Sequence, residues 1–165
     1  MAATVTINVF TGATPTDQGA LVGGIDLCSD DNALYSAANR IANPLYPDSY
    51  SYEKWLAPEV TVDPDNWIGL FKVWGDGDVD TNTTLRYGTT ASGAQPVNTA
   101  SSIATIDFTL VVAGSKGWWD NSTKTPAQIA LDAYFAFLVL QLYVSPSCVA
   151  GDWGPETIYY EYQEL

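Results

Sequence analysis

The most apolar run of the chain, residues 134–144, constrains the fold more than any other feature. Its even-numbered positions from 138 to 144 are leucine or valine, and its odd-numbered positions from 135 are aromatic or valine apart from Gln141. This period-two pattern indicates a β-strand. A strand that is apolar on both faces needs cover on two sides, so we expect an opposing sheet on one side and loops, a helix or a neighbouring chain on the other.

Similar alternating runs recur along the rest of the sequence. They predict strands at residues 4–10, 20–28, 49–56, 59–62, 67–74, 84–88, 102–112 and 157–163, with Pro58 separating the third from the fourth. Residues 89–101 and 114–125 are predicted loops, residues 33–41 are either a short helix or a loop, and residues 126–132 suit one helical turn. Eight or nine strands at this spacing are typical of a β-sandwich or jelly roll. We predict one all-β domain over residues 1–165 with at most one short helix.

The charge of the chain excludes several classes of partner. Nineteen acidic residues stand against four lysines and two arginines, which gives a net charge of −13. Such a surface repels phosphate groups, so we expect no direct binding to nucleic acid or to anionic membranes. The N-terminal residues lack the basic and apolar regions of a signal peptide, and residues 134–140 are too few to cross a bilayer. We expect a soluble protein synthesised in the cytoplasm.

The residue inventory argues against catalysis. The chain has no histidine, which excludes Ser-His-Asp and Cys-His systems and imidazole metal sites. A carboxylate pair of the glycosidase kind is the remaining type of site. The candidates Asp107, Asp132 and Glu161 are scattered through the predicted elements with no paired spacing. We therefore expect that the protein is not an enzyme.

The segment after the strand at residues 67–74 is rich in oxygen ligands that suit calcium. These ligands are Asp76, Asp78, Asp80 and Asn82. The EF-hand pattern fails, because Thr81 stands at its sixth position instead of glycine and Tyr87 at its twelfth instead of glutamate. A solvated acidic hairpin is the favoured interpretation and calcium binding is the alternative. We expect no other cofactor.

The two cysteines, Cys28 and Cys148, are 120 positions apart. A disulfide between them requires both proximity in the fold and an oxidising environment. In a cytoplasmic product the favoured interpretation is two small buried hydrophobic residues.

Six aromatic residues of the C-terminal third are candidates for an interface or for ligand stacking. Trp118, Trp119 and Trp153 lie in predicted loops, and Tyr159, Tyr160 and Tyr162 lie in the last predicted strand. Loop tryptophans can fold back over the ends of a sandwich, anchor a protein interface or stack on sugar rings. The tyrosines stabilise an edge strand or one that is shared across a subunit boundary.

The C-terminal third resembles a known kind of protein. Residues 137–146 are an apolar strand that reaches a proline-containing turn, residues 149–152 are a small glycine-bearing turn, and residues 157–162 read Thr-Ile-Tyr-Tyr-Glu-Tyr. This ending resembles that of accessory virion proteins from tailed phages and related viruses, in which such strands close a β-sandwich. Residues 67–87 are similar as well, because a Leu-Phe-Lys-Val-Trp strand precedes an Asp/Asn/Thr loop and a short strand.

The resemblance implies a structural protein of the virion, with no catalytic residues to transfer. Capsid decoration or cementing is the leading role, the partners are other virion proteins such as the major capsid protein, and we expect a homo-oligomer located in the virion. The main alternative is a carbohydrate-binding or adhesion module that uses the loop tryptophans. A tail-fibre or surface-filament subunit is a further variant.

Overall fold

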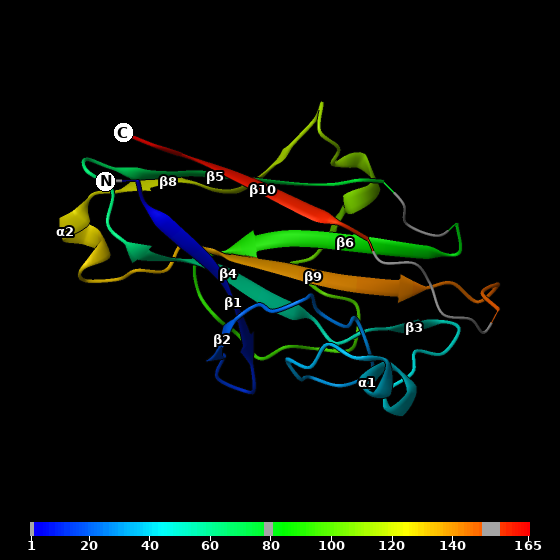
Figure 1. The fold of residues 1–165 in the computed structure, drawn as a ribbon. Coiled ribbons are helices and arrows are strands. Elements are labelled where there is room, and N and C mark those ends of the chain that lie inside the picture. The colour runs from blue at the N-terminus through cyan, green and yellow to red at the C-terminus, as the bar shows by residue number, and fades with distance from the viewer. Residues whose placement is uncertain (1, 78–80, 150–155) are drawn as a thin grey trace.

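A computed structural model describes residues 2–77, 81–149 and 156–165, and Figure 1 shows two antiparallel sheets facing each other. The larger sheet runs in the order β2 (Thr16–Ala20), β1 (Thr4–Thr11), β4 (Lys54–Val62), β9 (Phe137–Val144), β6 (Thr83–Thr90) and β7 (Ile106–Asp107), and β3 (Ser49–Tyr50) also pairs with β9. The smaller sheet has the order β10 (Ile158–Glu164), β5 (Ile68–Gly75) and β8 (Gly117–Lys124). The predicted all-β sandwich is confirmed.

Helices are short and few in the described part of the chain. They are α1 (Ala37–Ala42), α2 (Pro126–Ile129) and one turn of 3-10 helix, η1 (Phe108–Leu110). The described residues thus contain ten strands instead of eight or nine, and two short α-helices instead of at most one. None of these helices has the length and hydropathy needed to span a membrane.

The predicted central strand is confirmed as β9, which lies between β4 and β6. Its even-numbered residues face the smaller sheet, and Leu138 and Leu140 are fully buried there against Phe71 and Val73 of β5 in one core cluster. Its odd-numbered residues belong to the opposite face, where Val139 is fully buried in a second cluster with Trp55 and Phe10. Alternate side chains of this one strand therefore pack into two different core clusters.

The second face of β9 is covered by a loop of the same chain. Gln141 is buried there, and its Nε2 donates hydrogen bonds to the carbonyl oxygens of Ser51 (3.0 Å), Val97 (3.2 Å) and Thr99 (2.8 Å). Its Oε1 accepts the backbone N–H of Ser101 at 2.9 Å. The one polar interruption of the apolar run thus ties down residues 97–101. The chain itself therefore covers Val139 and Gln141 on this side of the strand.

The prediction that Pro58 separates two strands is wrong, because β4 continues through it. Pro58 lies opposite Ile7 of β1, and its carbonyl oxygen accepts the backbone N–H of Phe135 at 3.0 Å. The nitrogen and carbonyl of one residue point to the same side of a strand. The missing N–H of Pro58 therefore faces residue 135 and not β1, so the β1–β4 ladder loses no donor.

Two further strand predictions are wrong, at residues 20–28 and 102–112. Gly23 and Gly24 have φ values of 81° and 151°, which break an extended backbone. In the second segment only Ile106 and Asp107 pair with β6, and the Asp107 carboxylate then accepts the N–H of Thr109 and begins η1. Local capping by an aspartate competes with the sheet here.

Residues 114–125 are not the predicted loop, because β8 occupies most of them. Of the two alternatives for residues 33–41, a short helix is present, but it begins later, where the Ser36 hydroxyl accepts the N–H of Asn39 at 3.1 Å. The predicted turn of helix at residues 126–132 is confirmed as α2, with Pro126 at its start.

A substitution at Gly88 of β6 tests how closely residues 103–104 pack against the sheet. A Cβ atom at this position lies 1.9 Å from the carbonyl oxygen of Ile103. We expect Gly88→Ala to lower the free energy of unfolding by about 2 kcal/mol or more, because backbone must move to relieve the clash. Gly114→Ala is the matched control, since a Cβ there meets nothing within 4 Å. Urea denaturation measures both, and equal stability of the two variants would contradict the packing.

Gln141 provides a second test, because the substitution Gln141→Leu keeps its volume and removes its hydrogen bonds. The buried N–H of Ser101 and the carbonyls bound by Nε2 then lose their partner. We expect a loss of about 2–4 kcal/mol in the free energy of unfolding. Gln163→Leu on exposed β10 is the matched control and should change stability by less than about 0.5 kcal/mol. A neutral effect of Gln141→Leu would show that the loop does not depend on this side chain.

Candidate functional site

The adjacent tryptophans Trp118 and Trp119 lie in β8, so they point to opposite faces of the smaller sheet. Trp119 is buried, and its indole N–H donates to the carbonyl oxygen of Ala136 at 2.8 Å. Trp118 is 49% exposed on the outer face. The prediction that both belong to a loop is wrong, and they do not form one stacking platform. Trp153 lies outside the described residues.

The three tyrosines of β10 divide in the same way. Tyr160 packs edge-on to Trp119, with ring centres 6.3 Å apart, and Tyr162 packs on Phe71 at 5.4 Å, so both belong to the inner face. Tyr159 points outward and stacks on Trp74 of β5, with ring centres 5.6 Å apart and planes 15° apart. Of the singled-out aromatic residues that the structure describes, only Trp118 and Tyr159 share the outer surface.

Around these two residues the outer face of the smaller sheet carries a compact group of aromatic and lysine side chains, which we call the aromatic–lysine face. Strand register places Lys72 beside both Trp118 and Glu161, and Trp74 beside Tyr159. Lys116, just before β8, completes the group. The face consists of Lys72, Trp74, Lys116, Trp118, Tyr159 and Glu161.

The lysines of this face are held by the rings and by one carboxylate. The Lys72 Nζ lies 4.8 Å from the ring centre of Trp118, and the Lys116 Nζ lies 4.2 Å from that of Trp74. Lys116 also forms an ion pair with Glu161, with 2.6 Å between Nζ and Oε2. Such cation–π contacts order the flat rings at modest energy. Two lysines and one glutamate give the face a charge of +1 on a chain of −13.

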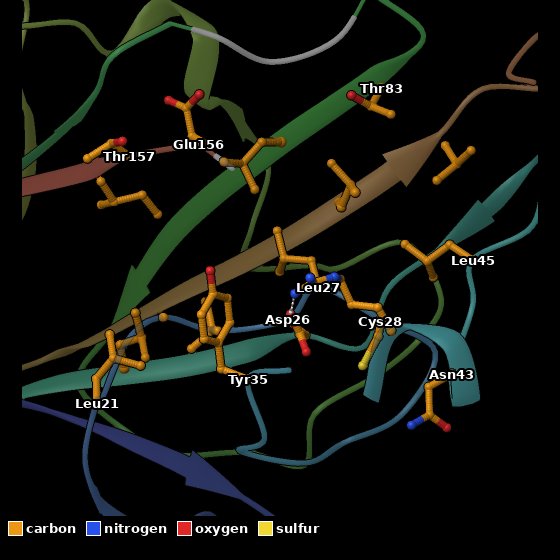
Figure 2. Close-up of a pocket in the computed structure, with 18 of the residues that line it drawn as sticks. Leu21, Asp26, Leu27, Cys28, Tyr35, Asn43, Leu45, Thr83, Glu156 and Thr157 are labelled. Carbon is orange, nitrogen blue, oxygen red and sulfur yellow. Dashed lines mark hydrogen bonds and ion pairs between the residues drawn. The ribbon is translucent and has the colours of Figure 1, made fainter. Parts of the chain in front are cut away.

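A second feature is a cleft of about 1060 Å³ between the two sheets, which we call the inter-sheet cleft. Its floor is apolar and comes from β1, β4, β6 and β9. Figure 2 shows Glu156 and Thr157, which lead into β10, on one side, and Leu21, Asp26 and Tyr35 on the other. The floor side chains are Ile7, Leu56, Leu85, Leu138, Leu142 and Val144.

A buried polar network holds the side of the cleft opposite β10. The Asp26 carboxylate accepts hydrogen bonds from the N–H of Ser36 (3.0 Å) and from Asn39 Nδ2 (3.0 Å), and it forms an ion pair with Arg40 at 2.9 Å. Burial alone would raise the pKa of Asp26, but the hydrogen bonds and the Arg40 charge outweigh burial and hold the pKa below its usual value of 3.8. The network fixes α1 against residues 26–36.

Lys54 joins the same region to the larger sheet. It is buried on β4, and its Nζ donates to the carbonyl oxygens of Asp30 (2.7 Å) and Asn32 (2.8 Å). Burial lowers the pKa of Lys54, and nearby negative charges, including those of Asp31 and Asp26, offset part of this effect. Lys54 is thus a structural cation that pins an irregular segment over β4.

The acidic segment predicted as a calcium site is only partly described. Asp78 and Asp80 lie outside the described residues. The Asp76 N–H donates to the carbonyl oxygen of Thr157 at 3.2 Å, and the Asn82 Oδ1 accepts the hydroxyl of Ser147 at 3.2 Å. Within residues 2–77, 81–149 and 156–165 no three histidine, cysteine or acidic side chains gather as metal ligands. Calcium binding stays a prediction.

The three carboxylates considered for glycosidase chemistry lie in separate elements, each with a partner of its own. Asp107 begins η1, Glu161 pairs with Lys116, and Asp132 pairs with Lys124 at 2.9 Å. The geometry assembles no carboxylate pair from these three residues.

Both cysteines are buried, as the favoured interpretation predicts. Cys28 is a free thiol, so Cys28 and Cys148 do not form a disulfide with each other. Both side chains lie along the inter-sheet cleft.

Sequence reasoning missed Lys72, Trp74 and Lys116 as members of a surface. The signal was present, because Lys72 and Trp74 are two positions apart in a predicted strand and therefore share a face. Their neighbour Trp118 could not be assigned to the same face, because residues 114–125 were predicted as a loop and a loop has no regular alternation of side chains. No protein-family model, curated protein or solved structure matches the chain.

The pKa of Asp26 leads to a prediction on pH dependence. Because its folded pKa lies below 3.8, the unfolded state binds more protons in the window between the two values. The stability contributed by Asp26 is therefore present above about pH 5 and is lost as pH falls through the folded pKa. We expect the free energy of unfolding to fall more steeply between about pH 5 and pH 3 in the wild type than in Asp26→Asn.

Urea denaturation at each pH measures this difference. Asp63→Asn, in the exposed turn after β4, controls for removing one negative charge from the chain. Parallel pH profiles of the wild type and Asp26→Asn would contradict the role of the network.

Proposed function

We propose that this protein is a non-catalytic structural subunit of a virus particle, most specifically a capsid decoration or cementing subunit. It attaches through the aromatic–lysine face to an acidic surface of a neighbouring virion protein. The observation that carries the proposal is the concentration of the half-exposed rings of Trp118 and Tyr159 and two of the four lysines on one face of the smaller sheet.

The chemistry of this face favours protein contact. Tryptophan and tyrosine give large contact area at low conformational cost and are enriched at binding hot spots, and the aliphatic lysine stems extend the apolar surface. Strand register and cation–π contacts already order the side chains, so attachment costs little further side-chain entropy. The face is positive while the chain as a whole is strongly negative, and charge complementarity therefore selects an acidic partner surface.

Two further observations support a structural role. The resemblance of the C-terminal segments to accessory virion proteins concerns β9 and β10, the strands that carry the core and one edge of the face. The chain has no histidine, and the carboxylates considered for catalysis are engaged separately. Repetition in a symmetric shell multiplies weak contacts of this kind.

Reconstitution of virus particles tests the proposal. Mass spectrometry of purified particles should find the protein, and particles stripped of it should bind the recombinant chain again. We expect Trp118→Ala to weaken this binding by about 2 kcal/mol, roughly thirtyfold in Kd, as for a hot-spot residue. Lys72→Glu should also raise the Kd, and the increase should be larger at low salt than at high salt, because salt screens the electrostatic contribution of Lys72.

Leu131→Ala is the matched control, since this residue is 90% exposed on the surface next to α2 and away from the face. Its binding should equal that of the wild type. Absence of the protein from particles, or equal binding of Trp118→Ala and Leu131→Ala, would overturn the proposal. Saturable quenching of Trp118 by an oligosaccharide, lost on Trp118→Ala, would favour the carbohydrate-binding alternative.

A further inference from the structure

The strand β10 ends the smaller sheet, and its second edge has no strand beside it in the described part of the chain. The Thr157 carbonyl oxygen accepts the N–H of Asp76, so the main chain of Thr157 points toward β5. Backbone direction alternates along a strand. The N–H and C=O groups of Ile158 and Tyr160 therefore point to the free edge. The hydrogen bond of Gly75, the residue opposite Ile158, is consistent with this direction. Its N–H donates to the carbonyl oxygen of Val111 and not to β10.

This free edge borders the inter-sheet cleft. The side chains of Ile158 and Tyr160 line the cleft, and Figure 2 shows Thr157 and Glu156 above its floor. Within the described residues no strand pairs with the main-chain groups of Ile158 and Tyr160 at the edge, and their side chains face the interior. The cleft exists because three strands do not cover a sheet of seven.

A second copy of the chain does not fit this edge as a whole domain. Antiparallel pairing of two β10 strands uses a two-fold axis perpendicular to the sheet, which places both larger sheets on the same side. Beside β10 that space already holds the cleft floor, built by Ile7, Leu56 and Leu138 of β1, β4 and β9. The larger sheets of the two copies would occupy the same volume, which excludes this dimer. The space beside β10 suits a single extended strand instead.

The charges of the lining restrict the occupant. Among the described residues its charged members are Asp26, Arg40 and Glu156, and Arg40 is paired with Asp26. The cleft therefore has a charge of −1 within a chain of −13. An acidic segment is repelled, whereas a neutral or basic one is accepted.

We propose that the inter-sheet cleft receives an extended segment of another protein, which adds to the free edge of β10 as a fourth strand of the smaller sheet. About six residues span this edge. Main-chain hydrogen bonds to Ile158 and Tyr160 hold the segment, and its alternate side chains pack on the leucine floor. The segment alternates apolar and polar residues and is neutral or basic. This contact uses a different surface from the aromatic–lysine face and goes beyond the proposed attachment.

Amide hydrogen exchange and synthetic peptides test the proposal on the intact chain. In the free protein the amides of Ile158 and Tyr160 should exchange much faster than that of Tyr159, whose main chain points toward β5. The probes are capped peptides of about eight residues in which valine, leucine or phenylalanine alternates with threonine or lysine. They should bind saturably, slow the exchange of both edge amides, and bind about tenfold tighter than scrambled peptides of equal composition.

Two variants block the site in different ways. Tyr160→Pro removes one edge N–H without removing a donor to β5, and it should weaken peptide binding about tenfold or more. Tyr160→Phe is the matched control and should bind like the wild type. Leu142→Trp fills the cleft from its floor without altering β10, so it tests the proposal even where the proline variant fails to fold. Trp118→Ala should not change peptide binding, which separates this site from the aromatic–lysine face.

Three results would overturn the proposal. Slow exchange of the Ile158 and Tyr160 amides in the free protein would show that the chain itself occupies the edge. Equal binding of alternating and scrambled peptides, or no binding of either, would exclude strand addition. Binding of 1-decanol in the cleft without binding of peptides would show that the site takes a small apolar molecule.

Discussion

The burial of β9 on both of its faces is the constraint on which the rest of the structure depends. On one face Leu138 and Leu140 require the smaller sheet, and on the other Val139 and Gln141 require the loop at residues 97–104. These layers are of different kinds. The smaller sheet packs on β9 through apolar contacts, with Trp119 and Asp120 of β8 adding hydrogen bonds to the main chain of Ala136. The loop is instead fastened by an amide that satisfies its backbone.

Buried polar groups have a similar purpose in other parts of the protein. Lys54 holds the carbonyls of residues 30 and 32, and Asp26 joins Ser36, Asn39 and Arg40. Both anchor irregular backbone that no strand pairing stabilises. Irregular segments bury few apolar side chains, so hydrogen bonds must specify their position. This anchored segment forms one side of the inter-sheet cleft.

Strand alternation creates both proposed binding surfaces from alternate residues of the same strands. Along β10, Tyr159 belongs to the outer aromatic–lysine face, while Tyr160 belongs to the inner face and the cleft. Along β8, Trp118 and Trp119 divide in the same way. A shift of one residue in either register would exchange the two surfaces. The pairing of β5 with its two neighbours therefore determines which aromatic residues meet a partner.

The all-β class, the central strand and the alternation of β5 and β10 follow from local sequence patterns, because a period of two depends only on local backbone geometry. The lack of histidine chemistry and the strongly acidic charge follow from composition. The strand at residues 117–124 has no such local signal, because Gly117 and residues 120–124 are polar or small and pair solely through β5. The place of Pro58 within a strand also depends on the tertiary structure. A proline is tolerated there only where its missing N–H points away from the neighbouring strand of the ladder. The aromatic–lysine face and the cleft combine residues from distant parts of the chain, and no local pattern encodes which strands become neighbours.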